Sequence, residues 1–313
     1  MSKRRLLVVG SQGFVGTNLL KAVQARHSDF DLLDFIDPQN GEKADIRCAE
    51  AVERTVSLAK ADSIIHLAAV ALPQQAKQDP TSAWMTNVIG TLNIAIAITR
   101  SSPESHLIWS GSSEAYGYSF NTLQGPLVEG TELQPSSAYG ATKAAGDIML
   151  RQMMYDGLKA TVFRPFNHTG PGQTSNYVVP AFAEQIAMIE AGLRDPIIKV
   201  GNLEAERDFL HVSDIINAYL LAVDNPSVSR GQTYNISTGS PVSIGRILNE
   251  LLSMSSGKIE VEIDPARYKP NPVPIASGNY AKLNRDLGWH PSMDLREIVS
   301  SVLAEQRSRV SRK

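Results

Sequence analysis

A glycine-rich turn near the start of the chain constrains the fold more than any other feature. Leu6 to Val9 form a short apolar run that predicts a strand, and Gly10-Ser11-Gln12-Gly13-Phe14-Val15-Gly16 and a helical pattern to about Arg26 follow directly. Glycines at this spacing let the backbone turn sharply beside a pyrophosphate, and the helix N-terminus offers it free N–H groups. The spacing is GxxGxxG rather than GxGxxG, but its place between the first strand and the first helix predicts a dinucleotide-binding fold.

An acidic residue stands where such a fold reads the ribose of the cofactor. The next predicted strand, Asp31 to Asp37, ends about 20 residues after the last glycine. A carboxylate at Asp37 would accept hydrogen bonds from the 2′- and 3′-hydroxyls and repel a 2′-phosphate. Pro38-Gln39-Asn40 follow without an arginine, so we expect NAD(H) to be favoured, while Lys43 keeps NADP(H) open. The plainer alternative for Asp37 is a turn residue before a proline.

Strands and helices then alternate along the first half of the chain. A helical pattern lies near Ala49–Lys60, and a longer one runs from about Pro80 to Arg100. The apolar runs between and after them predict buried strands at Ser63–Ala69, Leu107–Trp109 and Thr161–Arg164. This rhythm predicts an α/β protein with a doubly wound parallel sheet.

Beyond Pro165 the loops lengthen, and glycine and proline cluster. Helices are predicted near Val179–Gly192, Ser213–Val223, Ser243–Ser253 and Asp294–Arg307, and a strand at Thr233–Ile236 rejoins the sheet. We therefore predict a dinucleotide-binding domain of residues 1–165 plus about 212–238. A smaller, interleaved C-terminal substrate lobe would comprise about 166–211 and 239–313.

The candidate chemistry lies in Ser136 to Lys143. Tyr139 and Lys143 stand four residues apart, which places both side chains on one face of a helix. An ammonium close to a phenol lowers the pKa of the phenol and prepares it to exchange a proton with a sugar or alcohol oxygen. Ser112 follows the strand at Leu107–Trp109, where its hydroxyl can bond a substrate oxygen. The alternatives are an ordinary amphipathic helix and a serine-rich turn.

Composition excludes several classes of partner. The 313 residues are 20% charged with a net charge of −2, so no strong field favours nucleic acid or an anionic membrane. The longest apolar run, around Ile64 to Leu72, is far shorter than a membrane span, and the apolar run at the start is too short for a signal peptide. The single cysteine, Cys48, fits a reducing compartment. We expect a cytoplasmic protein without a metal site.

Seven motifs carry a resemblance to a known family. GSQGFVG, HLAA, TNVIGT, GSSEAYG, YGATK, RPFNHTGPG and RDFLHVSD occur in the order and spacing of the extended short-chain dehydrogenases/reductases that modify nucleotide-activated sugars, the NAD-dependent epimerase/dehydratase family. The resemblance covers nearly the whole chain. Within this family, FNHTGPGQ and PIIKVGNLEAERDF most resemble the GDP-4-keto-6-deoxy-D-mannose reductases, followed by the GDP-mannose 4,6-dehydratases.

The resemblance implies roles for individual residues. The catalytic positions are Ser112, Tyr139, Lys143 and, where dehydratases keep a carboxylate, Glu114. The cofactor positions are Gly10, Gln12, Gly13, Phe14, Val15, Gly16, Asp37, Asp45, Ile46, Leu67, Ala68, Ala69, Asn87, Tyr139, Lys143 and Phe166, with Asp45 and Ile46 flanking the adenine. The substrate positions are Ser112, Ser113, Glu114, Asn167, Val179, Lys199, Arg207 and Lys269. Arg207 would contact the diphosphate, and its plainer alternative is a surface salt bridge.

The chain departs from the nearest reductases at positions that grip the nucleotide. Lys269 stands where they usually carry an arginine, Pro272 near where they carry a glutamate, and His211 where they often have an acid. A lysine neutralises a diphosphate without the bidentate geometry of arginine. The base therefore stays open between GDP, UDP and dTDP.

The resemblance favours NAD(P)H-dependent reduction of a 4-keto-6-deoxy nucleotide sugar. A 4-epimerase or a 4,6-dehydratase with retained NAD is the alternative, and a non-catalytic dinucleotide sensor is a remote one, because a sensor has no need of Ser112, Tyr139 and Lys143 together. The resemblance also implies a homodimer through a four-helix interface of Pro80–Arg100 and Tyr139–Met154. The residues expected to face outward are Ile94, Ile98, Met149 and Met153, which could equally face the chain's own sheet.

Overall fold

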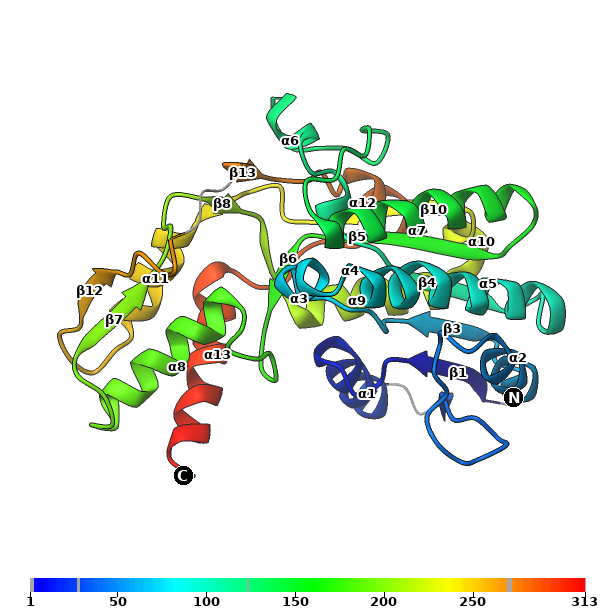
Figure 1. The fold of residues 1–313 in the computed structure, drawn as a ribbon, viewed down its shortest axis with the longest axis horizontal. Helices are drawn as coiled ribbons and strands as arrows, with labels where there is room; N and C mark the ends of the chain where they lie inside the picture. The colour runs from blue at the N-terminus through cyan, green and yellow to red at the C-terminus, as the bar shows by residue number, and fades with distance from the viewer. Residues whose placement is uncertain (1–2, 27–28, 123, 269–271, 313) are drawn as a thin grey trace.

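A computed structural model describes residues 3–26, 29–122, 124–268 and 272–312. Within these residues the main sheet has six parallel strands in the order β10-β5-β4-β3-β1-β2 (Figure 1). Their bounds are β1 Arg4–Val9, β2 Phe30–Asp34, β3 Ser63–His66, β4 His106–Ser110, β5 Ala160–Pro165 and β10 Gln232–Ile236. The predicted doubly wound parallel sheet is confirmed. The strand order reverses between β1 and β3, which is where such sheets bind their ligands.

Helices cover both faces of the sheet because alternate side chains of its strands are apolar on both sides. On one face, α1 (Phe14–Arg26) and α9 (Val212–Asp224) pack against Leu6 and Val8 of β1. On the other face, α2 (Ala49–Ala59), α5 (Gly90–Ser101) and α7 (Ala138–Tyr155) pack against Leu7 and Val9. The short helices α3 (Pro73–Gln78), α6 (Ser119–Thr122) and α10 (Pro226–Ser229) and a 3-10 turn at Ser113–Ala115 lie in the connections.

The predicted long helix from Pro80 is one stretch with a wider turn inside it. It consists of α4 (Pro80–Trp84), a π-helical turn at Met85–Ile89, and α5. By length and composition alone this stretch would suit a membrane span. Its residues Ile94 and Ile98 are, however, fully buried against the sheet. They do not face outward as the dimer expectation required, and Met149 and Met153 also pack against this core.

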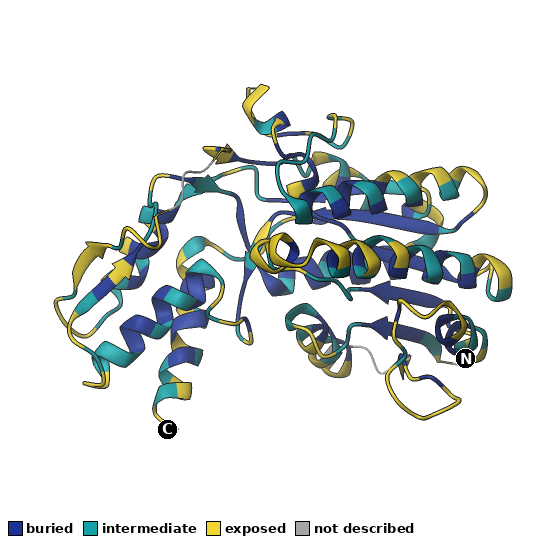
Figure 2. Ribbon diagram, in the orientation of Figure 1, coloured by how far each residue is buried: buried dark blue, intermediate teal, exposed yellow. Residues whose placement is uncertain are grey.

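The smaller lobe has its own apolar core at the left of Figure 1. It packs α8 (Val178–Glu190), α11 (Ile244–Ser253) and α13 (Leu295–Val310) together beside the parallel pair β7 (Ile197–Val200) and β12 (Glu260–Ile263). Short strands connect the lobes: β6 (Asn167–Thr169) pairs with β9 (Phe209–His211), and β8 (Glu206–Arg207) lies between β11 (Val242–Ser243) and β13 (Ile275–Ala276). The dark blue segments of Figure 2 mark the buried cores of both lobes.

One part of the predicted domain division needs correction. α12 (Ala281–Leu287) lies in the range assigned to the substrate lobe, but Leu283 and Trp289 pack into the core of the main sheet. The Trp289 indole donates a hydrogen bond of 3.0 Å to the carbonyl of Asp214 on α9, and Lys282 donates one of 2.9 Å to the carbonyl of Thr233 on β10. This stretch therefore covers the edge of the dinucleotide-binding domain at β10.

Candidate active site

The glycine turn between β1 and α1 has the backbone that a pyrophosphate site needs. Gly10 has φ +91°, and a Cβ added there would lie 2.6 Å from the amide nitrogen of Ala68. A Cβ on Gly16 would collide with the Gly10 carbonyl oxygen, whereas one on Gly13 would meet nothing nearer than that oxygen at 3.4 Å. The space over Gly13 at the start of α1 is thus open to a phosphate, so the turn fits a dinucleotide. Of the other predicted residues here, Gln12 is exposed, and Phe14 and Val15 are partly buried.

Small residues follow β3 beside this turn. The amides of Leu67 and Ala68 donate hydrogen bonds of 2.8 and 3.1 Å to the carbonyl of Val9, which holds the strand end against the glycine turn. Leu67, Ala68 and Ala69 remain partly exposed, so they leave room at the carboxyl edge of the sheet. Their placement agrees with the predicted path of a cofactor along this edge.

Asp37 lies beyond the end of β2 and is already paired within the chain. Its two carboxylate oxygens accept hydrogen bonds of 3.1 and 2.7 Å from Nε and Nη2 of Arg54 on α2, and these bonds hold its pKa below the usual value. The expectation that no arginine stands near this carboxylate is therefore wrong. The local sequence after Asp37 contains none, but α2 folds back and supplies one.

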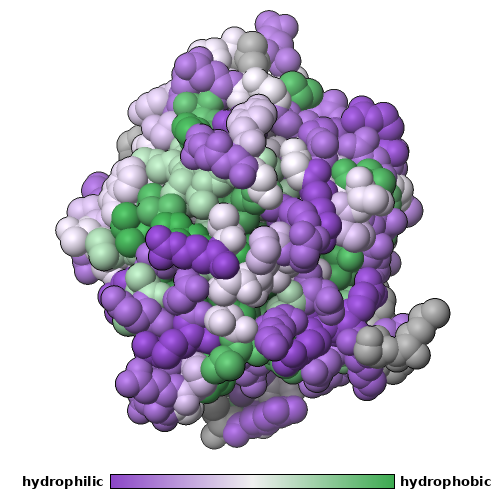
Figure 3. All heavy atoms as spheres, turned by 90° about the vertical axis from the view of Figure 1, so that its right-hand side faces the viewer, coloured by the Kyte–Doolittle hydropathy of each residue, from purple (hydrophilic) through white to green (hydrophobic). Residues whose placement is uncertain are grey.

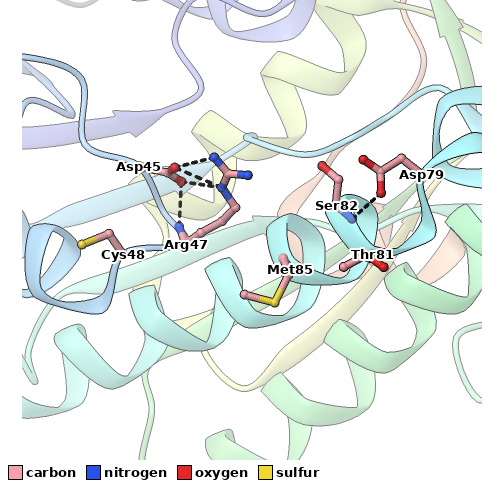
Figure 4. A pocket seen from close by; sticks show the side chains of 7 residues that line it. All are labelled: Asp45, Arg47, Cys48, Asp79, Thr81, Ser82 and Met85. Carbon is pink, nitrogen blue, oxygen red and sulfur yellow. Dashed lines mark hydrogen bonds and ion pairs between the residues drawn. The ribbon is translucent and has the colours of Figure 1, made fainter.

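The two predicted adenine residues differ in their surroundings. Asp45 is exposed and forms a bidentate ion pair with Arg47. Ile46 is buried against Gly90 of α5, where an added Cβ would clash with it. Beside Asp45 lies a hollow of about 490 Å³ between the loop before α2 and the start of α4 (Figure 4). Its lining residues are Asp45, Arg47, Cys48, Asp79, Thr81, Ser82 and Met85.

The structure brings Ser112, Tyr139 and Lys143 together at the carboxyl ends of β4 and β5. Helix α7 begins where the Ser137 hydroxyl accepts a hydrogen bond of 2.9 Å from the amide of Gly140. Tyr139, on its first turn, is hydrogen-bonded to Ser112. Lys143 donates a bond of 2.6 Å to the Ser110 carbonyl and lies 6.0 Å from the centre of the Tyr139 ring.

The expected acidification of Tyr139 by Lys143 is not what the structure gives. Burial raises the pKa of the Tyr139 phenol, and the hydrogen bond from Ser112 only partly opposes this effect. Burial also lowers the pKa of Lys143 to about 7, because an ammonium loses hydration there. At neutral pH the phenol is therefore protonated and able to donate its proton.

Several buried side chains hold the segments that carry Ser112, Tyr139 and Lys143 in place. Asn87, on the π-helical turn, donates hydrogen bonds of 3.1 Å to the Val70 carbonyl and 2.9 Å to the Thr142 hydroxyl. It thus positions α7 against the strand ends rather than presenting a free amide to a cofactor. Tyr219 of α9 donates a bond of 2.8 Å to the Ser110 hydroxyl from below the site. Sequence reasoning missed Tyr219, because a tyrosine in an apolar helix gives no signal beyond core packing.

A cavity of about 280 Å³ lies next to Ser112, between the two lobes. Ser113, Glu114, Asn167 and Arg207, four of the residues expected to bind substrate, line it. Sequence reasoning did not assign a substrate contact to its other lining residues, which are Gly117, Phe120, Ser136, Ser137, Pro272, Val273 and Ala276.

Two ionisable side chains, Glu114 and Arg207, line this cavity. Burial raises the pKa of the Glu114 carboxyl, while the positive charge of Arg207 opposes that effect. The Arg207 guanidinium donates bonds of 2.7 and 3.2 Å to the carbonyls of Glu206 and Pro274, which fix it at the cavity wall. The cavity, which begins at Ser113 next to Ser112, thus holds a fixed cation, and such a cation suits a diphosphate.

Three other predicted ligands that the structure describes do not reach the cleft with their side chains. Phe166 is buried beside the rings of Tyr116 and Phe120, which speaks against a cofactor contact through its ring. Val179 is buried in the core of the smaller lobe. Lys199 lies on β7, 4.0 Å from Glu262 and outside the cavity lining, and Lys269 lies outside the described residues. Among the described residues, no group of three or more His, Cys, Asp or Glu side chains is placed to hold a metal ion.

Known proteins of similar sequence and structure are nucleotide-sugar enzymes. The family model of GDP-mannose 4,6-dehydratase matches residues 7–302. GDP-6-deoxy-D-mannose reductase of Pseudomonas aeruginosa is 29% identical over 98% of each chain. The structure of RMD from the same organism complexed with NADPH superposes with a TM-score of 0.89 at 28% identity, covering 98% of this chain and 100% of that one.

An epimerase is also similar. UDP-glucose 4-epimerase of Thermus thermophilus in complex with NAD superposes with a TM-score of 0.77 at 25% identity, covering 97% of this chain and 99% of that one. The two solved relatives therefore hold different forms of the nicotinamide cofactor. The match with the family model extends over the glycine turn, the Tyr139 helix and the cavity between the lobes. The chain belongs to the GDP-mannose 4,6-dehydratase family of NAD(P)-dependent nucleotide-sugar enzymes, which are extended short-chain dehydrogenases/reductases.

Proposed function

We propose that this protein reduces a 4-keto-6-deoxy nucleotide sugar with NAD(P)H in deoxysugar biosynthesis. The observation that carries this proposal is the protonated Tyr139 phenol, hydrogen-bonded to Ser112 beside the cavity between the lobes. Reduction at C4 forms an alkoxide that must take up a proton. A phenol with a raised pKa is protonated at neutral pH and can donate that proton. The similarity to the reductase of P. aeruginosa supports the same reaction.

Three residues of the site, Ser112, Tyr139 and Arg207, have a defined part in this reaction. The nicotinamide cofactor supplies the hydride when it is bound. Ser112 holds the C4 oxygen, and Tyr139 donates its proton to it. Arg207 would hold the diphosphate at the far wall of the cavity, so the sugar is fixed at both ends and the entropic barrier to reaction falls.

The direct test is an assay with GDP-4-keto-6-deoxy-D-mannose and either NADH or NADPH. We expect loss of absorbance at the reduced nicotinamide band, together with formation of a 6-deoxy sugar nucleotide. No loss of this absorbance with GDP-, UDP- or dTDP-linked 4-keto-6-deoxy sugars would exclude the reductase. Parallel titrations with the three nucleoside diphosphates would identify the base by thermal stabilisation, since a ligand at 100 times its Kd adds about 2.7 kcal/mol.

The second candidate is a 4-epimerase or 4,6-dehydratase. Glu114 supports the dehydratase of the two, because a carboxyl whose pKa is raised by burial suits removal of the C5 proton of the sugar, whereas an epimerase would use Ser112, Tyr139 and Lys143 alone. These enzymes restore their cofactor in each turnover, so the purified protein would carry bound dinucleotide. A reductase must exchange its cofactor and is expected to purify largely empty.

We also propose that the protein is a cytoplasmic homodimer. The exposed residues Trp84, Met85 and Ile89 of the Pro80–Ser101 stretch, with Ile148 and Tyr155 of α7, lie on two adjacent helices. We call these five residues the outer helical face. The exposed free thiol of Cys48 is consistent with a reducing compartment.

A further inference from the structure

The ion pair between Asp37 and Arg54 places a cation outside an anion. The Asp37 side chain is 7% exposed, whereas that of Arg54 is 38% exposed. Nε and Nη2 of Arg54 bond the two carboxylate oxygens side by side, so the planar guanidinium covers the carboxylate. Nη1 of Arg54 donates no hydrogen bond to any residue that the structure describes. A ligand that approaches this end of the sheet therefore contacts Arg54 first, and the N–H groups of its Nη1 are available as hydrogen-bond donors.

The Asp37 carboxylate has little capacity left for a ribose. Its Oδ1 accepts from the Gln39 amide at 3.0 Å as well as from Nε of Arg54, and its Oδ2 accepts from Nη2. A carboxylate offers about four acceptor positions, so roughly one remains. Two ribose hydroxyls could both bond to Asp37 only if one of the present bonds were released.

The pair also changes what the site repels. An isolated carboxylate at the end of the second strand binds the 2′-hydroxyl and repels a 2′-phosphate, while an arginine nearby accommodates that phosphate. Here Arg54 offsets the charge of Asp37, and Glu50, one turn earlier on α2, also interacts electrostatically with Arg54. Guanidinium groups bind phosphate through paired N–H donors, and such charge-assisted bonds are stronger than neutral ones.

We propose that Arg54 sets the cofactor preference of this protein: it lets the adenosine ribose site accept a 2′-phosphate, so that NADP(H) binds as well as NAD(H). Asp37 and Arg54 act together. The carboxylate accepts a hydrogen bond from the 2′-hydroxyl of NAD(H), and the guanidinium donates hydrogen bonds to the 2′-phosphate of NADP(H). The inference depends on the use of a nicotinamide dinucleotide by the family and not on the sugar reaction proposed above.

The test is calorimetric binding without sugar substrate, using protein freed of any bound dinucleotide. NAD⁺, NADP⁺, 5′-AMP and 2′,5′-ADP are titrated into wild type, Arg54→Met, Arg54→Lys and Asp37→Asn. In wild type we expect the Kd values of NAD⁺ and NADP⁺ to agree within about tenfold. Arg54→Met should weaken NADP⁺ and 2′,5′-ADP by about 10- to 100-fold, the loss of one charge-assisted pair of hydrogen bonds, and NAD⁺ and 5′-AMP by less than about threefold. Asp37→Asn should weaken NAD⁺ more than NADP⁺.

Arg296→Met is the matched control, because Arg296 forms an exposed pair with Glu250 on the smaller lobe. It should leave the ratio of the two Kd values unchanged. Arg54→Lys keeps the positive charge but lacks the paired N–H donors of the guanidinium, so it should bind NADP⁺ with intermediate affinity. This variant supplies the test if Arg54→Met does not fold. Equal weakening of both cofactors by the Arg54 variants, or a wild type that binds NADP⁺ more than about 100-fold more weakly than NAD⁺, overturns the proposal. Neither result bears on the proposed reductase activity, which the assay with GDP-4-keto-6-deoxy-D-mannose tests separately.

Discussion

Tyr139 keeps its proton because burial raises the pKa of its phenol by more than the hydrogen bond with Ser112 lowers it. If this proton is the one delivered to the sugar oxygen, Tyr139→Phe should reduce turnover by about 10²- to 10⁴-fold, the usual worth of a positioned acid. Cofactor affinity, measured by calorimetry, should stay within about threefold, because the phenyl ring fills the same space. Tyr155→Phe is the control, since Tyr155 is 92% exposed at the end of the same helix. A Tyr139→Phe enzyme with normal turnover would remove the phenol from the mechanism.

Lys143 links stability to pH. Burial lowers its pKa from 10.5 to about 7, so between these values the unfolded chain binds a proton that the folded protein does not. Stability therefore rises with pH through this window, and the gain is lost as pH falls through about 7. Relative to Lys143→Met, the free energy of unfolding of wild type should increase by at most about 1.4 kcal/mol per pH unit from pH 7 to 10.

Urea denaturation at pH 7, 8.5 and 10 measures this dependence. The exposed Lys77 on α3 supplies the control, because Lys77→Met should follow the wild-type curve at every pH. Parallel curves for wild type and Lys143→Met would show that Lys143 titrates alike in the folded and unfolded chain.

At the scale of elements, two glycines of the turn between β1 and α1 are expected to have different roles: Gly16 in folding and Gly13 in dinucleotide binding. Gly16→Ala should destabilise the protein, because its Cβ would collide with the Gly10 carbonyl, and backbone atoms cannot move aside cheaply. Gly13→Ala meets only one atom at 3.4 Å, so the melting temperature should change little while dinucleotide affinity falls by about tenfold or more. Gly130→Ala, in open surroundings, is the control for both measurements. Normal dinucleotide affinity in Gly13→Ala would place the pyrophosphate elsewhere.

Periodicity predicted the main elements because each one buries its own repeat of apolar residues. The strand predicted at Leu107–Trp109 is β4, one residue longer at each end, and the predicted helix at Ala49–Lys60 is α2. The strand predicted to end at Asp37 instead ends at Asp34, because the chain turns and the Asp37 amide bonds the Glu42 carbonyl. The pattern of apolar residues along the sequence does not predict such a turn.

The places of the candidate catalytic residues were predictable from motifs, and their environment was not. Tyr139 and Lys143 share a helix face as their spacing predicts, but the effect of burial on their pKa values depends on atoms from distant segments. Arg54 lies 17 residues from Asp37 and carries no motif, so only the packing of α2 reveals their pairing. In the same way, a phenylalanine in a motif, Phe166, is buried in the core rather than lining the cleft.

At the scale of the whole molecule, the two lobes are joined by buried polar contacts as well as by the chain. Asp208 is fully buried between β8 and β9 and accepts hydrogen bonds of 2.7 and 2.9 Å from the amides of Thr238 and Gly239, which follow β10 of the main sheet. This carboxylate ties the strands of the connection to the dinucleotide-binding domain. Arg207 stands immediately before it, so the same contact fixes the cation at the cavity wall.

The proposed dimer is also a property of the whole molecule. Figure 3 shows hydrophobic residues gathered toward its left side, which is the side of the helices that face the viewer in Figure 1. Ile148 and Tyr155, two turns apart on α7, are 55% and 92% exposed, and Trp84 on the neighbouring helix is 43% exposed. Apolar side chains grouped in this way on adjacent helices are typical of an interface between subunits.

Charge placed on this outer helical face should separate the subunits. The double variant Trp84→Glu and Ile148→Glu puts carboxylates into the proposed interface, where their desolvation is costly, so we expect one chain of 34.0 kDa in place of twice that mass. Size-exclusion chromatography with light scattering measures this mass. Leu193→Glu, at an exposed position after α8, is the control and should leave the dimer intact. A wild type that is monomeric at micromolar concentration, or a double variant that still dimerises, would rule out this face as the interface.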